Sequence, residues 1–233
     1  MIDTLVSKSI MASSEIHKTS QKNIRKEREK KILDCAFTLF SKNGIDNTSM
    51  TEIAKKANIG VASLYRYFNT KEQIAIQCSI RTWKKMKIVF TKELSIDFLN
   101  GKTGLEICKE LLGVFRKSYF LYPYFYIYIY EFDLYIKRHK LDHKMLTEYE
   151  NVIKSVLQSS TAAIKRGFSD GSINPDLAEI AEPEELYTAV ASSLFFLVQK
   201  LAISANLLEM DSQMSGDRKI EIVTQLFINS LKK

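Results

Sequence analysis

Four side chains between residues 61 and 68 carry polar tips that could hydrogen-bond to a nucleic acid. They are Ser63, Tyr65, Arg66 and Tyr67. Leu64 and Phe68 lie four residues apart and are expected to face inward, as on a helix that buries one stripe. Hydroxyls and a guanidinium on the outer face can bond to base edges in a major groove and to phosphate oxygens. The chemistry that this segment suggests is therefore non-covalent recognition of DNA.

The surrounding residues predict two short helices joined by a tight turn. Ser49 and Glu52 are spaced as a capping box, in which each side chain bonds to the other residue's amide. Asn58 tolerates the left-handed conformation that ends a helix, and Gly60 can cap the next helix. Thr70 is placed to cap a third helix. The pattern predicts a helix-turn-helix whose second helix enters the major groove; an ordinary buried helical hairpin is the alternative.

The side-chain types predict how each residue would contact DNA. The predicted DNA-binding set is Thr48, Ser49, Gly60, Val61, Ala62, Ser63, Tyr65, Arg66, Tyr67 and Lys71. We expect Ser63 and Arg66 to contact the DNA directly, and Tyr65, Tyr67 and Lys71 to hold mainly phosphates. Thr48 and Ser49 should hold phosphates from the preceding helix. Val61 beside Ala62 favours apolar contact with a thymine methyl group.

This segment resembles the DNA-binding domain of the TetR family of one-component transcriptional regulators. The matching signature comprises Ala36-Phe37, Leu39-Phe40, Gly44, Thr48-Ser49, Ile53-Ala54, Ile59, Leu64-Tyr65-Arg66-Tyr67-Phe68 and Lys71-Glu72. Gly60 and Val61 depart from the common pattern, in which many members have Ser and then a polar or basic residue. The resemblance implies an all-α protein with an N-terminal three-helix DNA-binding domain. It also implies a larger C-terminal helical domain for ligand sensing and homodimerisation.

Charge and composition agree with a polyanionic partner. The chain has 233 residues, a formal net charge of +7 and a sequence pI of about 9.1. Basic residues crowd ahead of the motif at Lys18, Lys22, Arg25, Lys26, Arg28, Lys30 and Lys31. We expect a disordered basic arm over residues 1–22, the helix-turn-helix domain over 23–75 and the effector-binding and dimerisation domain over 76–233.

The apolar segments predict a cytoplasmic protein that does not enter a membrane. The first residues lack the apolar core of a secretory signal. The most apolar stretch, residues 191–208, is interrupted by Gln199 and Lys200 and is a poor membrane span.

Helices are expected at Glu27–Lys42, Ile74–Leu94, Leu105–Tyr122, Pro123–Lys140, Lys144–Gly167, Glu184–Glu209 and Asp217–Lys233.

Catalytic and metal-binding patterns are missing from the sequence. His139 and His143 are four residues apart, but Lys140 stands where a zinc-protease motif needs Glu. The three cysteines are scattered without the close pairs of a zinc site or disulfide framework, so we interpret them as small buried apolar residues. We therefore predict no metal, no cofactor and no enzymatic activity.

The segment from Tyr119 to Tyr135 is unusually rich in aromatic residues. Its alternation would suit a strand, but Pro123 and the helical neighbours favour a helix. Such residues are either core or the wall of an effector cavity, where a few hydroxyls orient an otherwise apolar ligand. The predicted cavity residues are Trp83, Phe115, Tyr119, Tyr122, Tyr126 and Tyr130.

Apolar stripes on the last two helices could form a homodimer interface. They comprise Leu186, Val190, Leu194, Leu197 and Leu201 on one helix, and Ile220, Val223, Phe227 and Leu231 on the other. Two such helices from each protomer would form a four-helix bundle. The alternative is that both helices pack only against their own chain.

The function expected from the sequence is a ligand-responsive, DNA-binding regulator. A repressor that binds a palindromic operator as a dimer and is released by a small apolar effector is the main hypothesis. A transcriptional activator or a ligand-independent regulator of the same fold is the alternative. A structural or membrane-surface helical protein would also use a positive charge, but the basic residues here cluster near the motif rather than along one amphipathic face.

Overall fold

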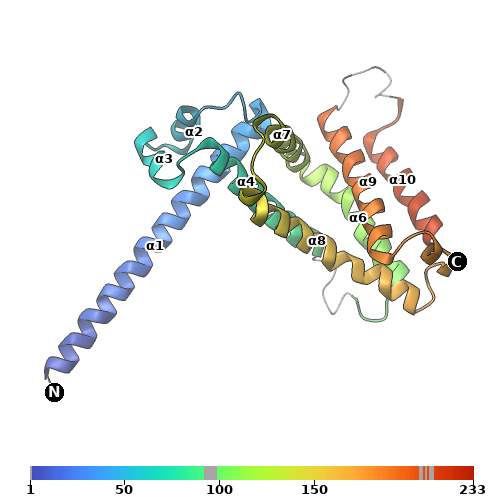
Figure 1. Ribbon diagram of the computed structural model, residues 1–233, viewed down its shortest axis with the longest axis horizontal. Coiled ribbons are helices and arrows are strands. Elements are labelled where there is room, and N and C mark those ends of the chain that lie inside the picture. Colours follow the sequence, from blue (N-terminus) through green and yellow to red (C-terminus); the bar gives the residue numbers. More distant parts are fainter. Residues whose placement is uncertain (1, 92–98, 205–206, 208, 210–212) are drawn as a thin grey trace. The chain divides into compact units, whose positions relative to one another are not determined.

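The computed structural model describes residues 2–91, 99–204 and 213–233, together with Leu207 and Glu209, and these residues form helices and no strand (Figure 1). The helices are α1 (Ile2–Asn43), α2 (Met50–Ala57), α3 (Val61–Tyr67), α4 (Lys71–Thr91), α6 (Gly104–Leu121), α7 (Pro123–His139), α8 (His143–Ser169), α9 (Pro183–Ile203) and α10 (Gly216–Leu231). A short 3-10 helix, η2 (Pro175–Glu179), lies in the turn-rich connection before α9. The protein is all-α, as the sequence predicts.

The chain divides into two compact units. The first is Met1–Cys78 and the second is Ser79–Lys233, and α4 runs through the boundary. The sequence places this boundary at residue 75, within the same helix. The predicted residues 92–94 at the end of this helix lie outside the described residues.

The first helix begins much earlier than predicted. The sequence suggests a disordered arm over residues 1–22 and a helix from Glu27, whereas α1 is continuous from Ile2 to Asn43. Neither Gly nor Pro occurs before Gly44, so nothing in this stretch breaks a helix. Gly44 has a φ of +82° and marks the end of the helix.

The helix-turn-helix has the local contacts that its sequence predicts. The Ser49 hydroxyl accepts a hydrogen bond from the Glu52 amide at 3.2 Å, and the Glu52 carboxylate accepts one from the Ser49 amide at 2.7 Å. Asn58 ends α2 in the left-handed conformation, with φ 56° and ψ 50°. Gly60 begins α3 in an extended conformation, and the Thr70 hydroxyl caps α4 by accepting from the Gln73 amide.

The core of the first unit explains why these short helices are stable. Its fully buried apolar side chains come from every helix, namely Ile32, Ala36 and Phe40 of α1, Ile53, Ala54 and Ala57 of α2, Leu64 of α3 and Ile74 and Ala75 of α4. A helix of seven residues is too short to persist alone. Packing of Leu64 against this core therefore holds α3 in place.

The second unit is a helical bundle in which α6 is a central element. It packs against α8, α9 and α10, while α7 packs against α9, and α9 lies beside α10 (Figure 1). Gly104 and Gly167 let α6 and α8 cross closely, since a Cβ at Gly104 would lie 2.0 Å from the Gly167 nitrogen. No other residue fits at this crossing without moving the two helices apart.

Polar contacts fix both ends of α6. At its N-terminus, a capping box joins Thr103 to Glu106, and the Asp170 carboxylate accepts a hydrogen bond from the Gly104 amide at 2.7 Å. Near its C-terminus, the Arg116 guanidinium makes a two-pronged ion pair with Asp217 at the start of α10. These contacts set the orientation of α6 against α8 and α10.

Helix α9 is long and apolar, and much of it stays accessible. By length and composition alone it could cross a membrane, a test that core helices of soluble proteins also pass. Only 28% of its most apolar stretch is buried inside the protein. Gln199, which interrupts this stretch, is buried and donates a long hydrogen bond of 3.5 Å to the Tyr126 carbonyl of α7.

Candidate DNA interface and ligand cavity

The outer face of α3 carries most of the predicted DNA-binding residues. Leu64 is fully buried, whereas Val61, Ala62, Tyr65 and Arg66 are exposed. The exposed fraction of Tyr65 reaches 47% although its ring is large and largely apolar. An exposed helix face with an aromatic hydroxyl and a guanidinium can meet a polar, negatively charged partner without any rearrangement of the core.

The Arg66 side chain is held in position by its own helix. Its Nη2 donates a hydrogen bond of 2.7 Å to the Ser63 hydroxyl, one turn earlier. This bond uses one of the five guanidinium N–H groups, so the others can still reach a base edge or a phosphate. The two residues predicted to contact DNA directly therefore form one pre-arranged pair.

A groove runs between α3 and the basic part of α1. Its volume is about 390 Å³ and it is lined by Gln21, Ile24, Arg25, Arg28, Ile59, Ser63, Arg66 and Tyr67. Three of these side chains are arginines and none is a carboxylate. The Arg25 guanidinium lies 5.8 Å from the centre of the Tyr67 ring, within the range of a cation–π contact. The groove is therefore built by α3 of the helix-turn-helix together with α1, which precedes it in the chain.

The predicted DNA-binding set contained no residue of α1, although the basic residues ahead of the motif indicated a polyanionic partner. The predicted helix began only at Glu27, so Gln21 and Arg25 were not placed on a helix. Gln21, Arg25 and Arg28 are spaced by four and three residues, which places them on one helical face. That spacing was the signal available in the sequence. The spacing places these three side chains on one face only if α1 is helical at these positions.

Two of the residues predicted to bind phosphates are instead engaged within the first unit. Thr48 is 1% exposed, and its hydroxyl donates to the Gly44 carbonyl at 2.8 Å. The Lys71 ammonium donates to the carbonyls of Ile45, Asp46 and Thr48 at 2.9, 3.1 and 3.1 Å. An ammonium has three N–H donors, so these bonds account for all of them.

Lys71 and Thr48 therefore stabilise the loop between α1 and α2. Ser49 remains exposed, but its hydroxyl serves the capping box. The same hydrogen bonds lower the pKa of the Glu52 carboxyl below its ordinary value. In the sequence, a residue that binds a phosphate and one that holds a loop look alike, because both are Lys or Thr beside a helix end.

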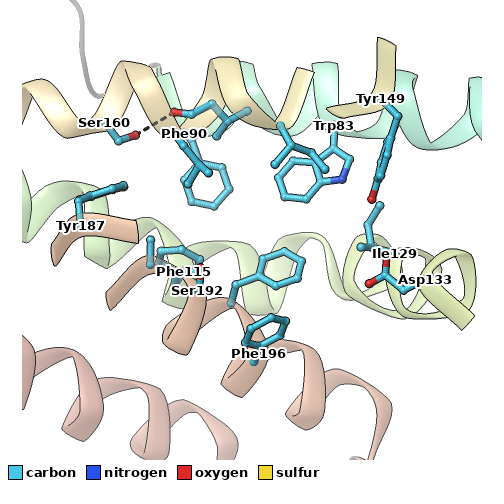
Figure 2. Close-up of a pocket in the computed structure, with 15 residues that line it drawn as sticks. Trp83, Phe90, Phe115, Ile129, Asp133, Tyr149, Ser160, Tyr187, Ser192 and Phe196 are labelled. Carbon is cyan, nitrogen blue, oxygen red and sulfur yellow. Dashed lines mark hydrogen bonds between the residues drawn. The ribbon is translucent and has the colours of Figure 1, made fainter. Parts of the chain in front are cut away.

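The second unit contains an aromatic cavity of about 230 Å³ (Figure 2). It is lined by Trp83, Phe90, Phe115, Ile129, Asp133, Tyr149, Ile153, Val156, Leu157, Ser160, Tyr187, Ala191, Ser192, Phe195 and Phe196. These residues come from α4, α6, α7, α8 and α9, so five helices build the wall. A mostly apolar wall with a few polar groups is the usual form of a site for a small molecule.

Most of the polar groups of the cavity lie at its two ends, and Ser192 is a further one in its wall. Figure 2 shows Ser160 and Tyr187 at one end and Trp83, Tyr149 and Asp133 at the other. Burial raises the pKa of the Tyr187 hydroxyl to about 12 and that of Tyr149 still further. Both hydroxyls therefore stay protonated near neutral pH and can donate a hydrogen bond to a ligand.

Trp83 has a buried indole N–H with no hydrogen-bond acceptor among the described residues. The Tyr149 hydroxyl is near enough for this N–H to lower its pKa slightly, but the two groups do not reach hydrogen-bond geometry. A buried donor without an acceptor costs free energy. A water or a ligand oxygen would therefore be stabilised at this end of the cavity.

The predicted effector residues divide among the cavity, the core and the surface. Trp83 and Phe115 line the cavity, but none of the four predicted tyrosines does. Tyr126 is fully buried, and its hydroxyl lies 2.5 Å from that of Ser118 in α6. Tyr119 packs against Gly216, while Tyr122 and Tyr130 are 40% and 37% exposed. On an aromatic helix, the sequence cannot show which side chains face the cavity.

Most of the cavity residues that were not predicted from the sequence come from α8 and α9, and the others are Phe90 of α4 and Ile129 and Asp133 of α7. Tyr149 and Tyr187 are isolated aromatic residues in otherwise ordinary helical patterns, and Phe195 lies beside Phe196 in an apolar stretch. The ring of Phe195 stacks on that of Trp83, with 5.6 Å between their centres. Such partners, more than a hundred residues apart, give no local signal.

The predicted dimer stripes are also divided by the structure. Leu194, Ile220 and Leu231 are buried within their own chain. The partly accessible members are Leu186, Val190, Leu197, Leu201, Val223 and Phe227. Phe196 and Leu226, which the prediction omitted, are 62% and 63% exposed. The accessible apolar residues of α9 and α10 therefore include most of the predicted ones together with Phe196 and Leu226.

The described histidines and cysteines do not gather into one site. Among the described residues, no three His, Cys, Asp or Glu side chains come together as a metal site would require. His139 packs on Tyr135, while His143 lies 3.5 Å from the Glu150 carboxylate. Burial raises the pKa of the Cys108 thiol to about 12, which keeps it protonated and unreactive.

Comparisons with known proteins agree with this geometry. Residues 32–78 match the family described as bacterial regulatory proteins, tetR family. Over 64 residues, the chain is 36% identical to the HTH-type transcriptional repressor KstR of Rhodococcus jostii (strain RHA1), which covers 28% of this chain and 30% of that protein. Over 44 residues, it is 52% identical to the biofilm operon icaADBC HTH-type negative transcriptional regulator IcaR of Staphylococcus aureus (strain Newman), covering 19% and 24%.

These sequence matches span less than a third of either relative. The likeness in structure extends further. The TetR family transcriptional regulator PfmR from Thermus thermophilus is similar with a TM-score of 0.63 and 18% identity, over 87% of this chain and 99% of that one. At this identity the likeness concerns the fold, including that of the second unit.

Proposed function

We propose that this chain, which belongs to the TetR family of bacterial regulatory proteins, is a ligand-responsive transcriptional repressor. It binds a palindromic operator as a homodimer through α3, and a small, mostly apolar effector in the second unit releases it. It acts in the cytoplasm, where its operator lies. The names of the two relatives, a repressor and a negative regulator, support repression over activation.

The observation that carries this proposal is the division of α3 into a buried and an exposed face. Leu64 anchors the helix, while Tyr65 and Arg66 stay exposed beside a groove rich in arginine. A catalytic function would require nucleophiles, acids or bases gathered around a cavity. The aromatic cavity instead holds mostly apolar side chains with scattered hydroxyls and one carboxylate, which suits binding rather than bond breaking.

Release by a ligand follows from the geometry of operator binding. Two recognition helices read successive major grooves only when they are about 34–36 Å apart, one turn of B-DNA. A ligand that binds more tightly to a conformation with another spacing lowers DNA affinity by its differential affinity for the two states. The partly exposed apolar residues of α9 and α10 would supply the dimer contact that sets this spacing.

The proposal is tested by selecting genomic DNA fragments with the purified full-length protein and footprinting the selected sequence. We expect two protected half-sites related by two-fold symmetry and a dimer in sedimentation. Arg66→Ala should weaken binding to this operator by about 1–3 kcal/mol. Arg138→Ala, which removes the same charge from the second unit, is the matched control.

Two outcomes would contradict recognition of DNA through α3, and a third would contradict repression. One is the failure to select any sequence above background. The other is equal loss of operator affinity in Arg66→Ala and Arg138→Ala, which would mean that charge alone, and not the recognition helix, holds the DNA. A reporter gene that falls silent when the protein is deleted would identify an activator instead.

A further inference from the structure

One end of the aromatic cavity carries a carboxylate that has no positively charged partner. Asp133 of α7 lines the cavity beside Tyr149 and remains accessible to solvent (Figure 2). No hydrogen bond or ion pair to it occurs among the described residues, and the surrounding apolar groups raise its pKa to about 6. The carboxyl is therefore mainly ionised at neutral pH and lacks a counter-charge.

The side chains around this carboxylate are those that attract a cation. Trp83 lies at the same end, edge to face with Phe125 at 5.0 Å and stacked on Phe195 at 5.6 Å. The faces of aromatic rings carry negative charge density, and Trp attracts cations most strongly. A positive group placed at the carboxylate would have aromatic rings beside it, while the Trp83 N–H can still donate to a water on the Tyr149 side of the cavity.

The remainder of the lining argues against an acidic ligand. None of the side chains that line the cavity is Lys, Arg or His. A ligand carboxylate or phosphate would thus enter a mostly apolar space without a counter-charge and would meet the Asp133 carboxylate at one end. Burial of an unpaired charge costs several kcal/mol, so such a ligand is disfavoured.

We propose that this cavity selects small aromatic or alkyl amines, with the ammonium at the Asp133 carboxylate and the apolar part reaching toward Ser160 and Tyr187. The inference rests on the proposed ligand-sensing function and names the class of its effector. The cavity of about 230 Å³ is smaller than the roughly 300–1,000 Å³ of drug-sized sites. The ligand should therefore be small, about the size of one ring and a short chain.

The chain contains its own probe for this test. Trp83 is the only tryptophan in the sequence and lines the cavity, so its fluorescence reports binding there directly. We would titrate the full-length protein at neutral pH with phenylbutylamine, phenylbutanol and phenylbutyrate. These probes share an apolar part and differ in the charge of the head group. The expected order of affinity is amine, then alcohol, then carboxylate, with about tenfold between the first two.

The role of Asp133 is tested with Asp133→Asn, which keeps the shape of the side chain and removes its charge. The variant should bind the amine about fivefold more weakly and the alcohol unchanged. Glu131→Gln removes the same charge from the same helix at a position outside the cavity, and it should bind all three probes as the wild type does. Circular dichroism would show that both variants are folded.

The possible results distinguish a failure of this inference from a failure of the proposed function. If the alcohol binds as tightly as the amine, or if Asp133→Asn and Glu131→Gln behave alike, the cavity is a ligand site without preference for a cation, and the inference is wrong. If none of the probes changes Trp83 fluorescence at millimolar concentration, the cavity is not an accessible ligand site. In that case the effector part of the proposed function is also wrong.

Discussion

The recognition helix and the aromatic cavity are assembled in opposite ways. The outer face of α3 consists of neighbours in sequence, from Val61 to Tyr67, placed on one short helix that begins directly after the turn at Asn58 to Gly60. The cavity takes side chains from five helices, and its lining residues are spread through the sequence from Trp83 to Phe196. One site is local and exposed, and the other is distributed and largely buried.

This difference decides which changes each region can tolerate. Exposed side chains of α3 can change with little effect on stability, because they make few contacts within the protein. The cavity residues are also core residues, and an altered ring there changes both the ligand site and the packing. DNA specificity can therefore vary independently of the fold, while effector specificity is coupled to stability.

The largest effect should come from removing the anchor of the recognition helix. Leu64→Ala deletes a fully buried side chain and should lower the free energy of unfolding of the first unit by about 2–5 kcal/mol. Operator binding, measured by electrophoretic mobility shift, should be lost. Because the cavity lies in the second unit, phenylbutylamine should still change Trp83 fluorescence.

Val61→Ala is the control for this comparison, since it shortens an exposed side chain of the same helix. Its free energy of unfolding should change by no more than about 0.5 kcal/mol. Loss of probe binding in Leu64→Ala, with the second unit still folded by circular dichroism, would show that the recognition helix and the cavity are not independent.

Substitutions of intermediate effect should distinguish Lys71, which holds the loop between α1 and α2, from residues that bind DNA. Lys71→Met removes the ammonium bound to three loop carbonyls and should destabilise the first unit by about 1–3 kcal/mol. Arg28→Ala, in the groove beside α3, should leave stability nearly unchanged. It should instead reduce the salt dependence of DNA binding by about one unit of slope.

Thermal unfolding and operator titrations at several salt concentrations distinguish these two roles. Loss of salt dependence in Lys71→Met at unchanged stability would show that Lys71 binds a phosphate, as the sequence alone suggested. Unchanged salt dependence in Arg28→Ala would remove α1 from the DNA interface.

The smallest effect concerns a tyrosine that belongs to the core and not to the cavity. Tyr126→Phe removes a buried hydroxyl that pairs with Ser118, at a cost of about 1 kcal/mol in the free energy of unfolding. Since Ser118 donates its proton to the Phe115 carbonyl, Tyr126 is the donor in this pair. Affinity for the amine probe should not change; a shift above twofold would return Tyr126 to the ligand site.

The secondary structure was largely predictable because its signals are local. The capping residues Ser49, Thr70 and Gly60, the left-handed Asn58 and the proline at the start of α7 all behave as the sequence indicates. The exception is the beginning of α1. A polar, charged stretch resembles a disordered segment in composition, and the absence of helix breakers was the weaker signal.

The sequence by itself determined the helix-turn-helix, the outward face of α3 and the all-α class. These depend on caps, turns and periodic burial within a few residues, which short-range backbone chemistry dictates. Only the tertiary structure decided that Thr48 and Lys71 hold a loop, that Tyr126 is core, and that Asp133, Tyr149 and Phe195 meet around one cavity. The physical reason is that every face of an aromatic helix looks alike in sequence, and the packing of distant helices chooses among them.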